Sequence, residues 1–140
     1  NAHPDVLRFT GDAPFKDVDM AEQFISGYDT YRKTGMGRWV IEILDTEEPV
    51  GWSGIKFHED ENLYDLGYRI LHRFWNKGIA TEAAIGCLNW IKGKEIKTVL
   101  SCVHQENHSS LRVSEKLGFK YAYERYYGET PWLIFEKSII

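Results

Sequence analysis

The chain has 140 residues, which is enough for one domain with a hydrophobic core. Hydrophobic residues make up 43% and charged residues 27% of it, the balance of an ordinary globular protein. A net charge of −4 disfavours a general nucleic-acid-binding protein, which is usually basic, and is compatible with a cationic substrate such as an amine. No apolar run reaches the length of a transmembrane helix. We therefore predict a single domain over residues 1–140 that binds neither nucleic acid nor a membrane.

Aromatic residues account for 14% of the chain, which fits either a core rich in ring packing or an aromatic-lined pocket. Cys87 and Cys102 lie in apolar stretches without metal-ligand spacing, so we predict reduced, buried thiols of a cytoplasmic protein. His104 and His108 lack a third ligand nearby, and no metal is expected. No signal peptide opens the chain, but its first residue is not Met, so trimming of the N-terminus stays open.

The first half of the chain predicts one helix followed by three strands. Residues 1–14 contain turn formers without a clear period. Apolar residues recur at helical spacing over residues 17–33, and Asp19 with Glu22 forms a candidate capping box near the start. Three strand-like stretches follow, at residues 39–44, 50–57 and 63–71, with polar turns between them.

The second half alternates helices and strands. An apolar stripe from Ala80 to Ile91 predicts a helix over residues 79–94, and a β-branched stretch predicts a strand over residues 97–103. A short helix over residues 109–117 is closed by Gly118 just after its C-cap. The last predicted elements are strands at residues 121–127 and 132–139. This order predicts an α+β fold whose mixed, largely antiparallel sheet is flanked by helices.

The junction before the helix at residues 79–94 is a candidate anion site. A helix N-terminus leaves several backbone N–H groups unpaired and carries a partial positive charge, and a preceding glycine lets an anion approach the backbone. Lys77 and Gly78 occupy this junction, and Thr81 adds a hydroxyl in the first helical turn. The segment lacks the glycine patterns of a P-loop or a dinucleotide site. A simple turn is the alternative on these grounds alone.

The residues around this junction resemble a family motif. The motif comprises Asp65-Leu66-Gly67-Tyr68-Arg69-Ile70 followed by Phe74-Trp75-Asn76-Lys77-Gly78-Ile79-Ala80-Thr81-Glu82-Ala83. It resembles the acetyl-CoA motif of the GNAT acetyltransferase superfamily, and more narrowly the branch that includes the ribosomal-protein N-terminal alanine acetyltransferases. Gly78 and Ala80 match the last two defined positions of the family's turn, while Trp75 stands where Gln or Arg is usual. Asn76 replaces a frequent glycine, but Asn tolerates positive φ, so the turn is still expected to form.

A second motif follows in the order that the resemblance requires. It comprises Glu106-Asn107-His108-Ser109-Ser110 and Glu115-Lys116-Leu117-Gly118-Phe119, which resemble the E-N-x-x-S and E-K-L-G-F parts of the branch. Two motifs with a helix and a strand between them are more specific than either alone. The resemblance covers nearly the whole chain and implies the GNAT-like acyl-CoA N-acyltransferase fold. The family's first strand and part of its first helix are expected to be missing from this chain.

The resemblance also implies where acetyl-CoA, the acyl donor, would bind. In the family, the strand before the turn carries a bulge and splays from its parallel neighbour, so that its backbone can bind the pantetheine arm. Carried over, the splayed strand covers residues 66–71 and its neighbour covers residues 97–103. Asn107 is expected to bind the cofactor arm or fix the strand end, with helix capping as the alternative. The predicted cofactor-binding residues are Arg69 and Ile70 at the bulge, Asn76, Lys77, Gly78, Ile79, Ala80 and Thr81 on the turn, and Asn107.

Acyl transfer from a thioester to an amine needs a neutral amine, a polarised carbonyl and a stabilised thiolate. Asp65 lies where the branch often has Glu, and we predict it as the general base or amine anchor, with a surface residue as the alternative. Glu124 is a second candidate base, with a partnered surface residue as its alternative. Many family members protonate the leaving group with a Tyr, whose position is Ser114 here. Ser110 matches the branch's motif serine and is predicted to donate to the sulfur, with capping as the alternative.

The sequence therefore predicts an acetyl-CoA-dependent N-acetyltransferase in which a primary amine attacks the thioester directly. The acceptor is open between a protein N-terminus and a small amine, and a homodimer is compatible with the resemblance. The alternative function keeps the fold without turnover, as an acyl-CoA-binding sensor or an assembly subunit, which the absent Tyr favours. The aromatic candidates for lining the acceptor pocket are Trp39, Trp52, Tyr64, Tyr68, Tyr126 and Tyr127.

Overall fold

The computed structural model describes residues 2–140 and begins with three short helices, α1 (Pro4–Leu7), α2 (Val18–Ser26) and α3 (Thr30–Thr34). Helix α1 was not predicted, because its turn formers include a proline at the first helical position, which suits a helix start as well as a turn. The single helix expected over residues 17–33 is interrupted at Gly27, the C-cap of α2. The predicted capping box is wrong, since Asp17 is the N-cap and its side chain accepts the Met20 N–H at 2.8 Å.

The strands follow the predicted order closely. They are β1 (Gly37–Glu42), β2 (Pro49–His58), β3 (Leu63–Ile70), β4 (Thr98–His104), β5 (Lys120–Tyr127) and β6 (Thr130–Ser138). Over residues 2–140 they form a six-stranded sheet in the order β1-β2-β3-β4-β6-β5. All neighbouring pairs run antiparallel except β3 and β4. The prediction of an α+β fold with a mixed, largely antiparallel sheet is confirmed.

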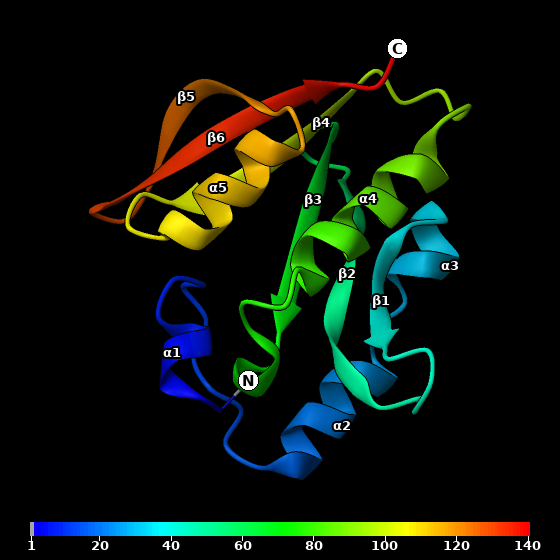
Figure 1. The fold of residues 1–140 in the computed structure, drawn as a ribbon, viewed down its shortest axis with the longest axis vertical. Coiled ribbons are helices and arrows are strands. Elements are labelled where there is room, and N and C mark those ends of the chain that lie inside the picture. The colour runs from blue at the N-terminus through cyan, green and yellow to red at the C-terminus, as the bar shows by residue number, and fades with distance from the viewer. Residues whose placement is uncertain (1) are drawn as a thin grey trace.

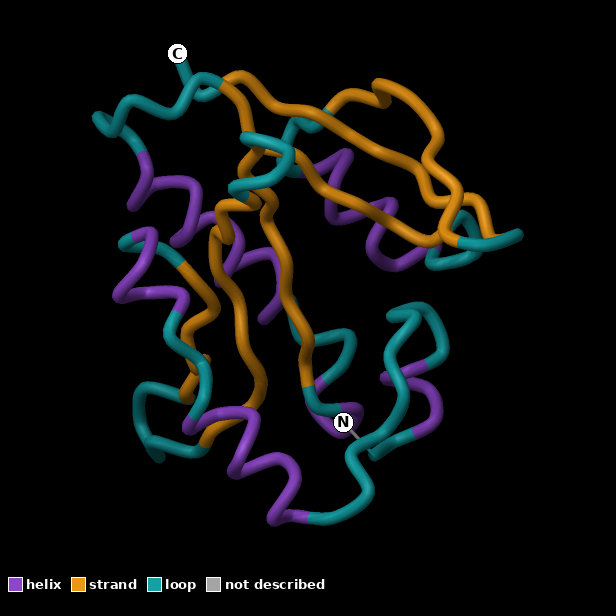
Figure 2. Tube along the Cα trace, turned by 180° about the vertical axis from the view of Figure 1, so that it is seen from behind, coloured by secondary structure: helices purple, strands orange, loops and turns teal. Residues whose placement is uncertain are grey.

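Helices α4 (Ile79–Ile91) and α5 (His108–Lys116) cover one face of this sheet (Figure 1). Seen from behind in Figure 2, the strands lie in front of these two helices. The predicted apolar stripe of α4 supplies Ala84, Cys87, Leu88 and Ile91 to the core, where they pack with buried residues of β2, β3 and β4. Gly118, at φ +78°, follows the C-cap of α5 as predicted. Burial of these apolar side chains is the main favourable term that holds the layers together.

The sheet divides into two halves that diverge between β3 and β4. Figure 1 shows β3 running down the middle of the molecule while β4, β6 and β5 turn away from it. Helix α1 lies beside the open end of the gap between these two halves of the sheet in both views. A short 3-10 helix, η1 (His72–Phe74), connects β3 to the turn before α4. Among the described helices, none has both the length and the apolar character needed to cross a membrane.

Candidate active site

The divergence of β3 from β4 creates the site. In the described chain the two strands pair at a single register position, Asp65 opposite Leu100. Beyond it, β3 continues to Ile70 without a ladder partner on that side, so its backbone groups face the opening. The splay between these strands is therefore present as the family resemblance implied.

The bulge expected at Arg69 and Ile70 is absent, and that expectation was wrong. The β2–β3 register runs without a shift from His58 opposite Leu63 to Gly51 opposite Ile70. Gly51 makes this possible, because a Cβ at that position would lie 2.2 Å from the carbonyl oxygen of Arg69. A glycine on the neighbouring strand thus lets β3 stay in close register to its end.

A cavity of about 940 Å³ fills the opening between the two strands. Its walls come from the ends of β3 and β4, from the turn before α4, from the first turns of α5, and from α1 with the residues after it. The cavity brings together all nine predicted cofactor-binding residues and two of the three predicted catalytic residues. These are Asp65, Arg69, Ile70, Asn76, Lys77, Gly78, Ile79, Ala80, Thr81, Asn107 and Ser110.

The turn before α4 leaves the start of this helix uncapped and open. Asn76 adopts φ +60° and Gly78 adopts φ +78°, so the Asn tolerates the left-handed conformation as predicted. Gly78 is the N-cap of α4 and makes no side-chain capping bond. A Cβ at Gly78 would meet no described atom within 4 Å, which leaves open space in front of the helix N-terminus. The Trp75 indole Nε1 donates to the Ile70 carbonyl oxygen at 2.9 Å and fastens the turn to the end of β3.

The N-terminus of α5 forms the opposite wall. Asn107 caps this helix, because its Oδ1 accepts the Ser110 backbone N–H at 3.2 Å, so the capping alternative is observed. Tyr68 on β3 donates its hydroxyl to Ser110 Oγ at 3.1 Å across the cavity. Burial raises the pKa of the Tyr68 phenol, which therefore stays protonated near neutral pH. Ser114, at the position of the family's Tyr, is buried and its hydroxyl bonds that of Ser101 at 3.3 Å.

Asp65 is held between two cationic or potentially cationic groups. Arg38 Nη2 lies 2.6 Å from Oδ2, and His58 Nε2 lies 2.6 Å from Oδ1. Burial by itself raises the pKa of the Asp65 carboxyl, but the hydrogen bond from His58 and the charge of Arg38 outweigh burial and keep this pKa below its ordinary value. The carboxylate is thus ionised and oriented at the apex of the splay.

Arg38 belongs to the site although the sequence motifs did not indicate it. In the sheet register Arg38 lies opposite Gly54, and Gly54 lies opposite Gly67, so two glycines stand in a row beside the arginine. The guanidinium crosses them to reach β3, donating from Nη1 to the carbonyl oxygens of Gly54 at 2.6 Å and Asp65 at 3.1 Å. A Cβ at Gly67 would lie 2.6 Å from Nη2. Glycines inside two neighbouring predicted strands were the signal in the sequence that something crosses them.

The remaining predicted residues are distributed as follows. Arg69 pairs with Asp12 at 2.7 Å, and its guanidinium lies 5.3 Å from the Trp52 ring centroid. Glu124 is exposed on β5 and does not line the large cavity. Cys102 is exposed rather than buried, which corrects the prediction, and it lines both the large cavity and a second cavity of about 200 Å³.

The aromatic candidates separate into four groups. Trp52 and Tyr68 line the large cavity, while Trp39 and Tyr64 pack against the hydrophobic core. Tyr127 lines a second, smaller cavity, and Tyr126 is exposed on β5. Both the core and the pocket interpretation of the aromatic content therefore apply, each to different rings.

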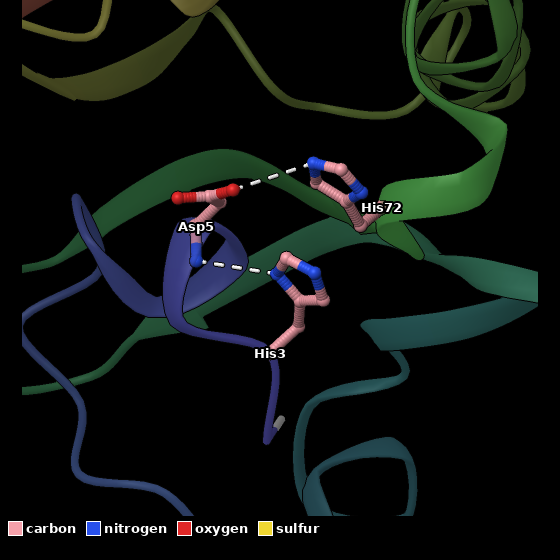
Figure 3. A group of neighbouring side chains, drawn as sticks. All are labelled: His3, Asp5 and His72. Atoms are coloured by element: carbon pink, nitrogen blue, oxygen red, sulfur yellow. Dashed lines mark hydrogen bonds and ion pairs between the residues drawn. The ribbon is translucent and has the colours of Figure 1, made fainter.

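His3, Asp5 and His72 form a cluster of neighbouring side chains (Figure 3), of which Asp5 lines the large cavity. The ligand atoms of the three side chains lie within 4.8 Å of one another, a spacing that could hold a metal ion. The two imidazoles stack with centroids 4.1 Å apart and planes inclined by 10°, so their in-plane lone pairs run side by side rather than toward one point. Asp5 also pairs with His72 at 3.4 Å. These contacts attach α1 to η1.

Comparison with known proteins places this arrangement in a family. A family model described as "Acetyltransferase (GNAT) domain" matches residues 1–120. An uncharacterised Bacillus subtilis protein, YkkB, is 27% identical over 139 residues, which span 96% of this chain and 80% of that relative.

Two solved structures share the fold at low sequence identity. The GNAT-family acetyltransferase from Bacillus anthracis superimposes with a TM-score of 0.81 at 20% identity, covering 99% of this chain and 84% of its own. The spermidine N-acetyltransferase from Vibrio cholerae, solved in complex with CoA and spermine, gives a TM-score of 0.79 at 12% identity, with coverages of 97% and 83%.

Proposed function

Because this chain belongs to the GNAT acetyltransferase family, we propose that it transfers an acetyl group from acetyl-CoA to a primary amine. The observation that carries the proposal is the opening between β3 and β4, which has the turn at residues 76–81 at one end and the Tyr68–Ser110 pair across it. An elongated opening for a thioester and polar groups that line the same cavity together support this proposal. The six-stranded, splayed sheet by itself supports the fold rather than the reaction.

The residues of the turn fit the acyl donor's pyrophosphate. Uncapped N–H groups at the start of α4 and the Lys77 ammonium supply positive charge, and Gly78 leaves space for an anion. The free edge of β3 beyond Asp65 offers backbone donors and acceptors to an amide-containing arm. The acyl donor supplies an activated carbonyl, and the chain's own residues bind and orient it.

Ser110 and Tyr68 are proposed to stabilise the departing thiolate. Tyr68 donates its proton to Ser110 Oγ, which leaves the serine's own hydroxyl hydrogen free to point at another acceptor in the cavity. A hydroxyl donor directed at the sulfur would lower the barrier for C–S cleavage. The capping bond from Asn107 holds the Ser110 backbone, so the hydroxyl is presented from a fixed position.

Asp65 is proposed to receive or anchor the amine at the apex of the splay. Asp65 and Glu124 are the two predicted carboxylates, and of these Asp65 lines the large cavity while Glu124 does not. Its ionised state favours an incoming ammonium group, and a carboxylate within reach can accept a proton as the nitrogen attacks. Glu124, being exposed on β5, has weaker support as a base.

The acceptor is proposed to be a primary amine of either a small molecule or a protein N-terminus. The spermine complex of the Vibrio cholerae structure supports a small-molecule amine for a protein of the same fold. The resemblance to the ribosomal-protein alanine acetyltransferase branch supports a protein N-terminus. A direct test is thiol release from acetyl-CoA with a panel containing spermidine, an amino sugar and a peptide that begins with alanine. If acetyl-CoA binds but no amine raises thiol release above background, the non-catalytic sensor is the better description.

A further inference from the structure

The smaller cavity reaches Asp65 from the other face of the sheet. It has a volume of about 200 Å³ and shares Asp65 and Cys102 with the large cavity. Leu66 on β3 and Val99 on β4 pack in the hydrophobic core with residues of α4. Because neighbouring side chains of a strand point to opposite faces, Asp65, Leu100 and Cys102 lie on the face turned away from α4. This face offers an amine a way to Asp65 that does not cross the turn before α4.

The walls of the smaller cavity are mostly apolar. Aliphatic and aromatic side chains line it, namely Leu63, Leu100, Ile134, Tyr123 and Tyr127. Burial raises the pKa of the Cys102 thiol to about 11 and also raises that of the Tyr127 phenol, so both groups are uncharged near neutral pH. Such walls favour the apolar body of a ligand, because contact with them removes apolar surface from water.

The carboxylates that line this cavity already have cationic or potentially cationic partners. Asp65 contacts Arg38 and His58. Glu61, from the β2–β3 loop, forms an ion pair with Arg125 on β5, and both side chains are partly exposed, at 36% and 39%. Asp65 can still take one ammonium group, because a carboxylate oxygen accepts more than one hydrogen bond. A second positive charge on the same ligand would meet a Glu61 carboxylate that Arg125 already neutralises.

From these walls and charges we propose that the smaller cavity holds the body of the amine acceptor and selects a short apolar monoamine over a diamine or polyamine. This inference rests on the proposed acetyl transfer. Water occupies about 30 Å³ per molecule in the liquid, so a cavity of about 200 Å³ has room for about seven non-hydrogen atoms. The second ammonium of a diamine would have to displace Arg125 from Glu61 or stay unpaired against apolar walls, and both are unfavourable.

The chemistry at the nitrogen is the same for either class of amine. The ammonium group binds at Asp65, and its nitrogen forms the amide bond with the acetyl carbon. The C–S bond breaks and its electron pair goes to sulfur. Two protons leave the nitrogen, one to the CoA thiol and one to water. Selection between the amines therefore depends on the far end of the chain, which lies in the smaller cavity.

The test compares hexylamine with 1,5-diaminopentane as acceptors in the thiol-release assay. The two molecules have the same number of non-hydrogen atoms, and a methyl group in the first stands where the second has an ammonium group. We expect the wild-type kcat/KM for hexylamine to exceed that for 1,5-diaminopentane at least tenfold. An equal or higher kcat/KM for the diamine would overturn the proposal.

Arg125→Met tests the ion pair at the rim of the cavity. The variant leaves the Glu61 carboxylate available for a second ammonium group, so the preference for hexylamine should fall at least fivefold. Adding Glu61→Gln to this variant should restore the preference. Lys120→Met is the matched control, because it removes a cation from β5 that lines neither cavity, and it should keep the wild-type preference. A loss of stability alone would lower turnover of both amines without changing their ratio.

Two results would overturn this selection while leaving the acetyltransferase assignment intact. One is an unchanged preference in Arg125→Met. The other is turnover of spermidine or of the alanine peptide without turnover of hexylamine. Absence of turnover by the wild-type enzyme with every amine would instead remove the proposed function and the selection together.

Discussion

Replacing Gly67 by alanine tests whether Arg38 is held on β3 as the structure indicates. The added Cβ would lie 2.6 Å from Arg38 Nη2 and 2.8 Å from Cζ, so the guanidinium must move. The contact most directly lost is the 2.6 Å bond from Nη2 to Asp65 Oδ2. Hydrogen bonds to charged groups contribute about 1.5–3 kcal/mol, and partial exposure of both partners places this one toward the lower part of that range.

We therefore expect Gly67→Ala to destabilise the protein by about 2 kcal/mol, which for a domain of this size lowers Tm by about 6 °C. Differential scanning calorimetry at pH 7 measures the shift. Gly86→Ala on α4 is the matched control, since a Cβ there meets no described atom within 4 Å and alanine should stabilise a helix by about 0.5–1 kcal/mol.

The same change in an Arg38→Met background completes a double-mutant cycle. The flexible thioether can move away from the new methyl group, so Gly67→Ala should cost much less there. A Gly67→Ala variant that melts at or above the wild-type temperature, or that is destabilised equally in both backgrounds, would contradict the close contact between this position and Arg38.

Three further predictions concern the turn, the leaving group and acid stability. Gly78→Val should weaken acetyl-CoA binding at least tenfold, as measured by calorimetric titration, because valine strains a φ of +78° and fills the space proposed for the anion. Gly128→Val is the matched control, since Gly128 has a φ of +63° and similar open space in the β5–β6 turn, and this variant should keep wild-type affinity for acetyl-CoA. Tyr68→Phe should lower kcat about tenfold with little change in acetyl-CoA affinity, and equal kcat would contradict the role given to its hydroxyl. Because the folded-state pKa of Asp65 is lowered, its ion pair stabilises the protein above the ordinary carboxyl pKa and is lost as pH falls below it. Denaturant unfolding should accordingly show Asp65→Asn less stable than wild type at pH 7 and the difference shrinking by pH 3; a gap that stayed constant with pH would speak against the pairing.

The sequence by itself determined the elements whose signals are local. Periodicity located the six strands, α4 and α5, because each buries one face or stripe and its apolar residues repeat accordingly. The backbone of the turn before α4 was also predictable from local residue types, since Asn76 and Gly78 both accept positive φ. The splay between β3 and β4 came from resemblance rather than from pattern, and the accompanying bulge was not found.

Only the tertiary structure decided which side chains of the site contact one another. Arg38, His58 and Asp65 come from three strands, and Tyr68 meets Ser110 across 42 positions of sequence, so no local period reports these contacts. The exposure of Cys102 depended on the divergence of β3 and β4, which leaves a mid-strand side chain facing a cavity instead of a neighbour. Propensity and periodicity describe a residue's own segment, whereas ion pairs and cavities depend on which segments the fold brings together.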